Sequence, residues 1–221
     1  MRYPALIELQ KEVVACRAAA IADASNECHA VTKYKCAGDC GPMITVPWAD
    51  QIDYPVQVLT VGINPKWTDH PDEAQKRIPR GEIDGPKAFD KYKETILSGL
   101  PEGTGVAHVE LVQCGSKYGR QANRVIGTCR KKFFDKVVAE VKPRVIVPIG
   151  KWACEHLYWY NTASGKSGRP CGSMRARHGT SDRACIAGHE CAIVFVLQPS
   201  CGVSHEERRT ARERIAQVFI G

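Results

Sequence analysis

The sequence has no long hydrophobic run. No stretch of its 221 residues approaches the ~18 consecutive apolar residues that a membrane-spanning helix requires. Residues 1–24 carry charges among their apolar positions, so we do not expect a secretion signal there. These positions instead predict a helix whose apolar face holds Leu6, Leu9, Val13, Cys16 and Ala20. We therefore expect a cytoplasmic protein that has no membrane partner.

Internal repeats, low-complexity tracts and linker-like segments are also missing. A hydrophobic content of 43% and a charged content of 25% are ordinary for a globular protein. A chain of this length can form one sizeable α/β domain or two small ones. Since nothing in the sequence marks a boundary, we expect a single domain over residues 1–221 and a monomeric protein.

Hydrophobic runs that predict strands alternate along the chain with segments that predict helices. The expected strands are the run that ends at Gly62 and residues 106–113, 144–149 and 191–198. Helices are expected at the N-terminus and over 86–99, 130–141, 151–160 and 205–219, with residues 161–190 as an irregular loop. Ser204 and Glu207 predict a capping box for the last helix. This alternation predicts a three-layer α/β/α fold around a mostly parallel, four-stranded sheet.

The first strand, which begins at Val56, ends abruptly in Gly62-Ile63-Asn64-Pro65. Glycine and Asn-Pro predict a sharp turn at the edge of the sheet. Ligands of open α/β sheets bind at the carboxyl ends of the strands, so Asn64 would bring a polar amide to a candidate active site. The simpler interpretation is that Asn-Pro only makes the turn.

Eleven cysteines are present, and an odd number without a secretion signal argues against a disulfide framework. Cys36 and Cys40 form one pair, and Cys114 and Cys129 form a second pair 15 positions apart. Two separated pairs suit a four-thiolate site for zinc or a [4Fe–4S] cluster, and the wide first gap favours the cluster. Scattered free thiols, or Cys28 in place of Cys36, are the alternatives. Packed thiols are expected at Cys16, Cys154 and Cys191.

Acidic residues are nearly missing from two stretches that are rich in lysine and arginine. Residues 115–132 have no acid, and residues 161–183 have Asp182 alone, in a chain of net charge +7. These stretches are either solvated faces or a phosphate-binding surface, and their shared sign favours the surface. Their cations are Lys117, Arg120, Arg124, Arg130, Lys131, Lys132, Lys166, Arg169, Arg175, Arg177 and Arg183.

Taken together, these features resemble the uracil-DNA glycosylase superfamily, especially its branch with an iron–sulfur cluster. The four cysteines match that branch in order and spacing, except that the first gap is longer by one residue, and Gly62-Ile63-Asn64-Pro65 looks like the Asn-bearing version of the first motif. Gln198-Pro199-Ser200-Cys201-Gly202-Val203-Ser204 looks like the second motif, which follows the last strand. The similarity spans about residues 30–215. Iron–sulfur members usually carry Glu in the first motif and His in the second, whereas this chain has Asn64 and Gln198.

The resemblance implies monofunctional hydrolysis of the N-glycosidic bond of uracil in DNA, after the nucleotide has been flipped out of the duplex. Asn64 would position the attacking water, and Gln198 would donate to O2 of the leaving base. Glu110, where the family usually has a base-reading Asn, or His108 on the same face, would read the base. The rest of the base site would comprise Gly62, Ile63 and Pro65, with Trp67 or Phe89 stacked on the base. Neither motif has a lysine nucleophile, so strand cleavage is not expected.

The resemblance also implies that the loop after the last strand enters a DNA groove, with Val203 or His205 at its tip. Arg175, Arg177 and His178 would contact phosphates, and His178 is a candidate for the imidazole missing from the second motif. Further contacts to DNA are expected from Pro199, Ser200, Gly202 and Ser204. Two alternatives to a uracil-DNA glycosylase stay open. One is a nucleic-acid-binding protein without catalysis that keeps a four-cysteine metal site, and the other is a glycosylase for hypoxanthine or xanthine.

Overall fold

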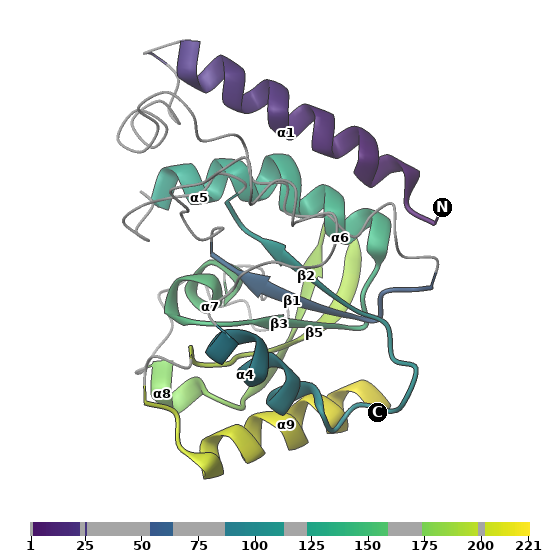
Figure 1. Ribbon diagram of the computed structural model, residues 1–221, viewed down its shortest axis with the longest axis vertical. Coiled ribbons are helices and arrows are strands. Elements are labelled where there is room, and N and C mark those ends of the chain that lie inside the picture. The colour runs from purple at the N-terminus through teal and green to yellow at the C-terminus, as the bar shows by residue number, and fades with distance from the viewer. Residues whose placement is uncertain are drawn as a thin grey trace. The chain divides into compact units, whose positions relative to one another are not determined.

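The computed structural model describes residues 2–22, 25, 54–63, 87–112, 123–158, 174–198 and 202–221. Its helices are α1 (Pro4–Ala22), α4 (Lys87–Leu97), α5 (Asn123–Cys129), α6 (Asp135–Val141), α7 (Lys151–Tyr158), α8 (Met174–Arg177) and α9 (His205–Ile220) (Figure 1). A π-helical segment, Arg130–Phe134, joins α5 to α6. The strands are β1 (Val58–Gly62), β2 (Val106–Glu110), β3 (Val145–Pro148), β4 (Ser181–Ile186) and β5 (His189–Val194).

The chain separates into two compact units. The first unit comprises Met1–Pro55, Ile63–Asp84 and Val109–Glu140, and the second comprises Val56–Gly62, Gly85–His108 and Val141–Gly221. The expectation of one domain over the whole chain stays a prediction. In the part of the chain that the structure describes, no helix is long and apolar enough to cross a membrane.

The strands form one five-stranded sheet in the order β2-β1-β3-β5-β4. β1 pairs in parallel with β3, and β3 pairs in parallel with β5, whereas β4 is antiparallel to β5. β1 and β2 are joined at their starts by the bond from Val58 N–H to Gly105 C=O, and just after their ends by the bond from Val112 N–H to Ile63 C=O. The residue numbers increase in the same direction along both strands, which is the pattern of parallel neighbours. The α/β class and the mostly parallel sheet are therefore confirmed, but the expected number of four strands is wrong.

The strand that the sequence did not predict is β4, which lies within the expected irregular loop 161–190. It forms a hairpin with β5 through Ala187 and Gly188, whose φ angles are 51° and 79°. Two consecutive left-handed residues are the geometry of the tightest hairpin turns, which Asn-Gly or Asp-Gly usually supply. Alanine seldom adopts this conformation, so the local sequence gave little sign of the turn.

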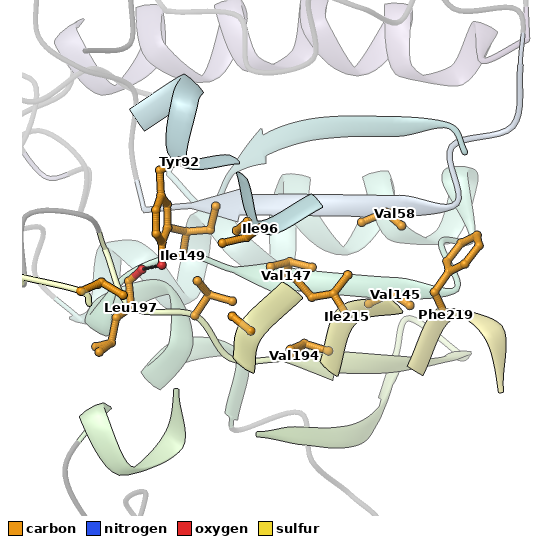
Figure 2. Packing of buried hydrophobic residues seen from close by; sticks show 13 residues of the cluster. Val58, Tyr92, Ile96, Val145, Val147, Ile149, Val194, Leu197, Ile215 and Phe219 are labelled. Atoms are coloured by element: carbon orange, nitrogen blue, oxygen red, sulfur yellow. Dashed lines mark hydrogen bonds between the residues drawn. The ribbon is translucent and has the colours of Figure 1, made fainter. Parts of the chain in front are cut away.

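β1 and β3 are buried at every position. This burial is expected, because continuous apolar runs in the sequence predict central parallel strands. α4 and α9 pack side by side against one face of the sheet in the second unit (Figure 1). The core there joins helical side chains to Val58 of β1, to alternate residues of β3 and to Val194 of β5 (Figure 2). Its members include Val58, Tyr92, Ile96, Val145, Val147, Val194, Val196, Ala211, Ile215 and Phe219.

α9 begins with the capping box that the sequence predicted. The Ser204 side chain accepts from the Glu207 N–H, and the Glu207 carboxylate accepts from the Ser204 N–H at 2.8 Å. These bonds to Ser204 lower the pKa of Glu207 below its usual range, because they favour the charged carboxylate.

In the first unit, α1 buries Leu6, Leu9 and Val13, which confirms this part of the expected apolar face. Cys16, expected to be packed as well, is only half-buried. The helix expected over residues 130–141 begins earlier, at Asn123, and passes through the π-helical segment, where Phe133 and Phe134 are buried.

Tyr92 gives a test of how α4 holds the end of the sheet. Its hydroxyl donates to the backbone carbonyl of Leu197 at 2.8 Å, in a buried position (Figure 2). Tyr92→Phe removes this donor, so we expect a loss of about 1–2 kcal/mol in the free energy of unfolding, measured in urea. Tyr3→Phe is the control, because the Tyr3 hydroxyl bonds the Tyr54 carbonyl at the longer distance of 3.5 Å, in a part-buried position. Equal, small losses in both variants would contradict this expectation.

Candidate functional site

The order of the strands gives the sheet a point at which ligands of α/β proteins usually bind. β1 lies between β2 and β3, so the chain leaves β1 toward one neighbour first and later returns on its other side. In open α/β sheets, ligands usually bind at such a reversal, outside the carboxyl ends of the strands. In the second unit, Ile149 N–H donates to Val61 C=O and Gly150 N–H donates to Val196 C=O, both at 2.8 Å. The ends of β1, β3 and the segment after β5 therefore lie in a row.

Gln198 lies at this edge and is exposed. Its side chain lies against Gly150, which has a φ of +94°. A Cβ built at Gly150 would lie 3.4 Å from Oε1 and 3.5 Å from Cβ of Gln198. Glycine is favoured at position 150 by its left-handed backbone, and the Gln198 side chain lies within van der Waals range of this position. The arrangement presents a neutral hydrogen-bonding group at the edge predicted to hold the site.

The first motif is described only in part. Gly62 is the buried last residue of β1, and Ile63 is half-buried with its carbonyl bonded to the Val112 N–H at 2.9 Å. For Phe89 the structure describes the backbone, within α4, but not the side chain. The other predicted site residues outside the described part are Asn64, Pro65, Trp67, Pro199, Ser200, Cys36, Cys40 and Cys114.

The burial pattern of β2 confirms that His108 and Glu110 share a face. Both are half-buried, whereas the alternate residues Ala107 and Val109 are buried. The Thr60 hydroxyl lies 3.1 Å from the Ala107 carbonyl and 2.9 Å from Nδ1 of His108. Its single proton goes to the carbonyl, so the ring nitrogen donates to Thr60. In the neutral ring, a base contact by His108 would therefore use Nε2 as an acceptor.

His178 does not have the environment of a phosphate contact or a catalytic imidazole. Only 8% of its surface is exposed. Its Nδ1 accepts from the Leu197 N–H at 3.0 Å, and its Nε2 donates to the Glu207 carbonyl at 2.6 Å. Both ring nitrogens thus bond to the backbone, and the predictions that placed His178 on DNA or in catalysis are contradicted.

The two arginines near His178 also have partners within the protein. The Arg175 guanidinium pairs with the Glu207 carboxylate at 2.9 Å and reaches the Gly202 carbonyl at 3.5 Å. The Arg177 guanidinium lies 4.0 Å from the centre of the Tyr158 ring, a cation–π geometry. This geometry does not support their predicted phosphate contacts, since the partners compete with DNA for both cations.

The predicted wedge residues differ in exposure. Val203 is 5% exposed and belongs to the core cluster of the second unit, so the prediction that it forms the tip of the loop is wrong. The Val203 side chain packs in that cluster instead, where its burial is favourable. Gly202 and His205 are exposed, and Ser204 serves as the helix cap. His205 stays as the candidate tip.

Of the four predicted metal ligands, the structure describes Cys129, which is 7% exposed at the end of α5. Within the described ranges, no group of three or more His, Cys, Asp or Glu side chains could hold a metal ion. Four thiolates are a donor set that fits zinc or a [4Fe–4S] cluster, and a buried ligand suits either one. The metal site stays a prediction.

The expectation of packed thiols is confirmed for Cys154 and Cys191, which are both buried. Burial raises the pKa of each thiol to about 12. Since the thiolate is the reactive form, we expect both to alkylate about 100-fold or more slowly than half-exposed Cys185 in the native protein at pH 8. Peptide mass spectrometry after timed labelling measures this, and denatured protein is the control. Native labelling of Cys191 as fast as Cys185 would contradict it.

Sequence reasoning missed Thr60, Tyr92 and Gly150, each of which lies against a candidate site residue or its neighbour in the chain. Thr60 is the one polar residue in an otherwise apolar strand, and Gly150 follows a strand directly, so both gave a faint signal. Nothing local distinguishes Tyr92 from an ordinary core aromatic. No protein-family model matches the chain, and no curated protein matches it either.

Proposed function

We propose that the chain is a monofunctional DNA glycosylase that hydrolyses the N-glycosidic bond of uracil in DNA, as a step of base-excision repair. We propose for it the three-layer α/β/α fold of the uracil-DNA glycosylase superfamily. The observation that carries the proposal is the exposed Gln198 amide, which lies next to Gly150 at the carboxyl edge of the sheet. In sequence, β1 ends at this edge two residues before Asn64.

The proposed chemistry needs a donor for the leaving base and a positioned water. As the bond breaks, the sugar becomes cation-like and uracil leaves as an anion with charge on O2. The Gln198 N–H donates to that oxygen, which stabilises the charge as it develops. Asn64 is neutral, so it acts by holding the attacking water through its amide oxygen rather than by removing a proton.

Residues of β2 recognise the base. An ionised Glu110 accepts the N3–H of uracil, and a protonated Glu110 also donates to O4. His108, oriented by Thr60, is the competing reader and would accept N3–H at Nε2. With Nε2 as an acceptor, His108 disfavours cytosine, whose N3 is an acceptor too. Trp67 or Phe89 would stack on the flipped base.

Affinity for DNA comes mainly from phosphate contacts. The net charge of +7 supports this, as do the exposed Lys131 and Lys132 of the π-helical segment. Cys36, Cys40, Cys114 and Cys129 would hold a [4Fe–4S] cluster, or zinc as the alternative, with a structural role. A cytoplasmic, monomeric protein remains our expectation.

The proposal is tested with labelled oligonucleotides that carry uracil, hypoxanthine or xanthine, both single- and double-stranded. We expect alkali-labile abasic sites from uracil, reduced in Asn64→Ala and Glu110→Ala. An unchanged rate for Glu110→Ala would transfer base reading to His108. Release of hypoxanthine or xanthine alone would favour the purine-base enzyme. Tight DNA binding without release of any base would favour the binding protein.

A further inference from the structure

Leu197, the residue before Gln198, is held in an unusual way. The sheet ladder from β3 ends where Gly150 N–H donates to Val196 C=O, one residue earlier. Leu197 is 4% exposed, and a buried backbone amide needs partners. Side chains supply them on both sides. Nδ1 of His178 accepts its N–H at 3.0 Å, and the Tyr92 hydroxyl donates to its carbonyl at 2.8 Å.

Histidine suits position 178 because the two backbone groups beside it need one acceptor and one donor, and the two nitrogens of an imidazole ring can supply both. One ring nitrogen accepts from Leu197, and the other donates to the Glu207 carbonyl in the first turn of α9. Only the neutral ring with its proton on Nε2 satisfies both partners. His178 therefore joins the segment after β5 to the first turn of α9.

We propose that His178 is a positioning residue for base release: through Leu197 it sets the place of the Gln198 amide. This inference rests on the proposed glycosylase function. It assigns His178 no contact with substrate, since both ring nitrogens bond to the backbone. Small displacements of a catalytic group lower the rate of the chemical step steeply, so the effect belongs to kcat rather than to KM.

Two substitutions each remove one of the two hydrogen bonds that the His178 ring makes. In His178→Asn, Oδ1 replaces the acceptor Nδ1, so the bond to Leu197 is retained and the bond to Glu207 is lost. In His178→Gln, the amide reaches toward Glu207 but leaves the Leu197 N–H without its acceptor. Both variants lose one buried hydrogen bond of similar strength, so a merely structural role predicts similar losses of stability and activity.

We expect kcat for uracil release to fall about 10- to 100-fold in His178→Gln and by less than about threefold in His178→Asn, with KM unchanged in both. Hydrogen exchange at the Leu197 amide should be faster in His178→Gln and near wild type in His178→Asn. His189→Gln is the control, because His189 also bonds a backbone carbonyl, that of Pro143, at 2.9 Å. It should leave kcat unchanged.

Equal kcat in the Asn and Gln variants, or a loss that lies in KM, would overturn the proposal. So would exchange at Leu197 that does not differ between the two variants. If the wild-type protein releases no base, the proposed glycosylase function fails. Exchange at Leu197 then still decides whether His178 holds this backbone, since that measurement needs no activity.

Discussion

Gln198→Ala is expected to lower kcat for uracil release about 100-fold with little change in KM. The loss of one donor that acts on developing negative charge typically costs about 10²- to 10³-fold in rate, and a neutral amide lies at the lower end. Its position favours this role, because the side chain is exposed at the carboxyl edge and lies against Gly150. Single-turnover kinetics on a uracil-containing duplex measure the effect.

Two further substitutions at Gln198 distinguish the effect of its N–H donor from the effect of its side-chain size. Gln198→Glu keeps the size of the side chain but replaces the N–H with a negative charge, so it should be at least as slow as Gln198→Ala. Gln198→His offers the residue that iron–sulfur members of the resembled superfamily usually carry, and a charged imidazolium is a stronger donor. It should release uracil at least as fast as wild type. A rate for Gln198→Ala within about twofold of wild type would contradict the role of Gln198, since one donor is worth far more.

Cys129→Ser is expected to lower bound iron from about four atoms per chain to nearly none, if the four cysteines hold a [4Fe–4S] cluster. A cluster with a missing thiolate is labile, and the folding free energy that metal binding supplies is lost with it. We therefore expect a colourless protein with a lower unfolding midpoint. Iron, zinc and sulfide analysis of the purified protein, together with thermal unfolding, measures both effects.

The control for this change is Cys185→Ser. Cys185 lies half-buried in β4 and is outside the predicted ligand set, so its substitution should leave metal content and colour unchanged. Zinc in place of iron would select the alternative metal. Unchanged metal content in Cys129→Ser, or wild-type protein without any metal, would contradict the predicted site.

Much of the sheet could be predicted because its signals are local. The apolar runs that became β1 and β3 are buried throughout, as central parallel strands must be. Alternation along β2 placed His108 and Glu110 on one face. Ser204 and Glu207 form their capping box within four residues of chain, so sequence alone sufficed there.

The errors concern features that depend on distant partners. His178 in its basic loop looks like a solvated or phosphate-binding residue, and only the fold brings it to Leu197 and Glu207. Val203 was predicted as a wedge because members of the resembled superfamily insert the segment after the second motif into a DNA groove, yet it is buried in a core cluster with side chains of α9. β4 was missed because its hairpin turns at an alanine with a left-handed backbone.

The most direct test of the central claim is to identify the products that the wild-type protein forms from a duplex with one uracil. We expect free uracil and an intact strand with an abasic site, both detected by mass spectrometry, and no cleavage before alkali. Bound but chemically unchanged DNA under single-turnover conditions, in a protein that carries its full metal content, would contradict it.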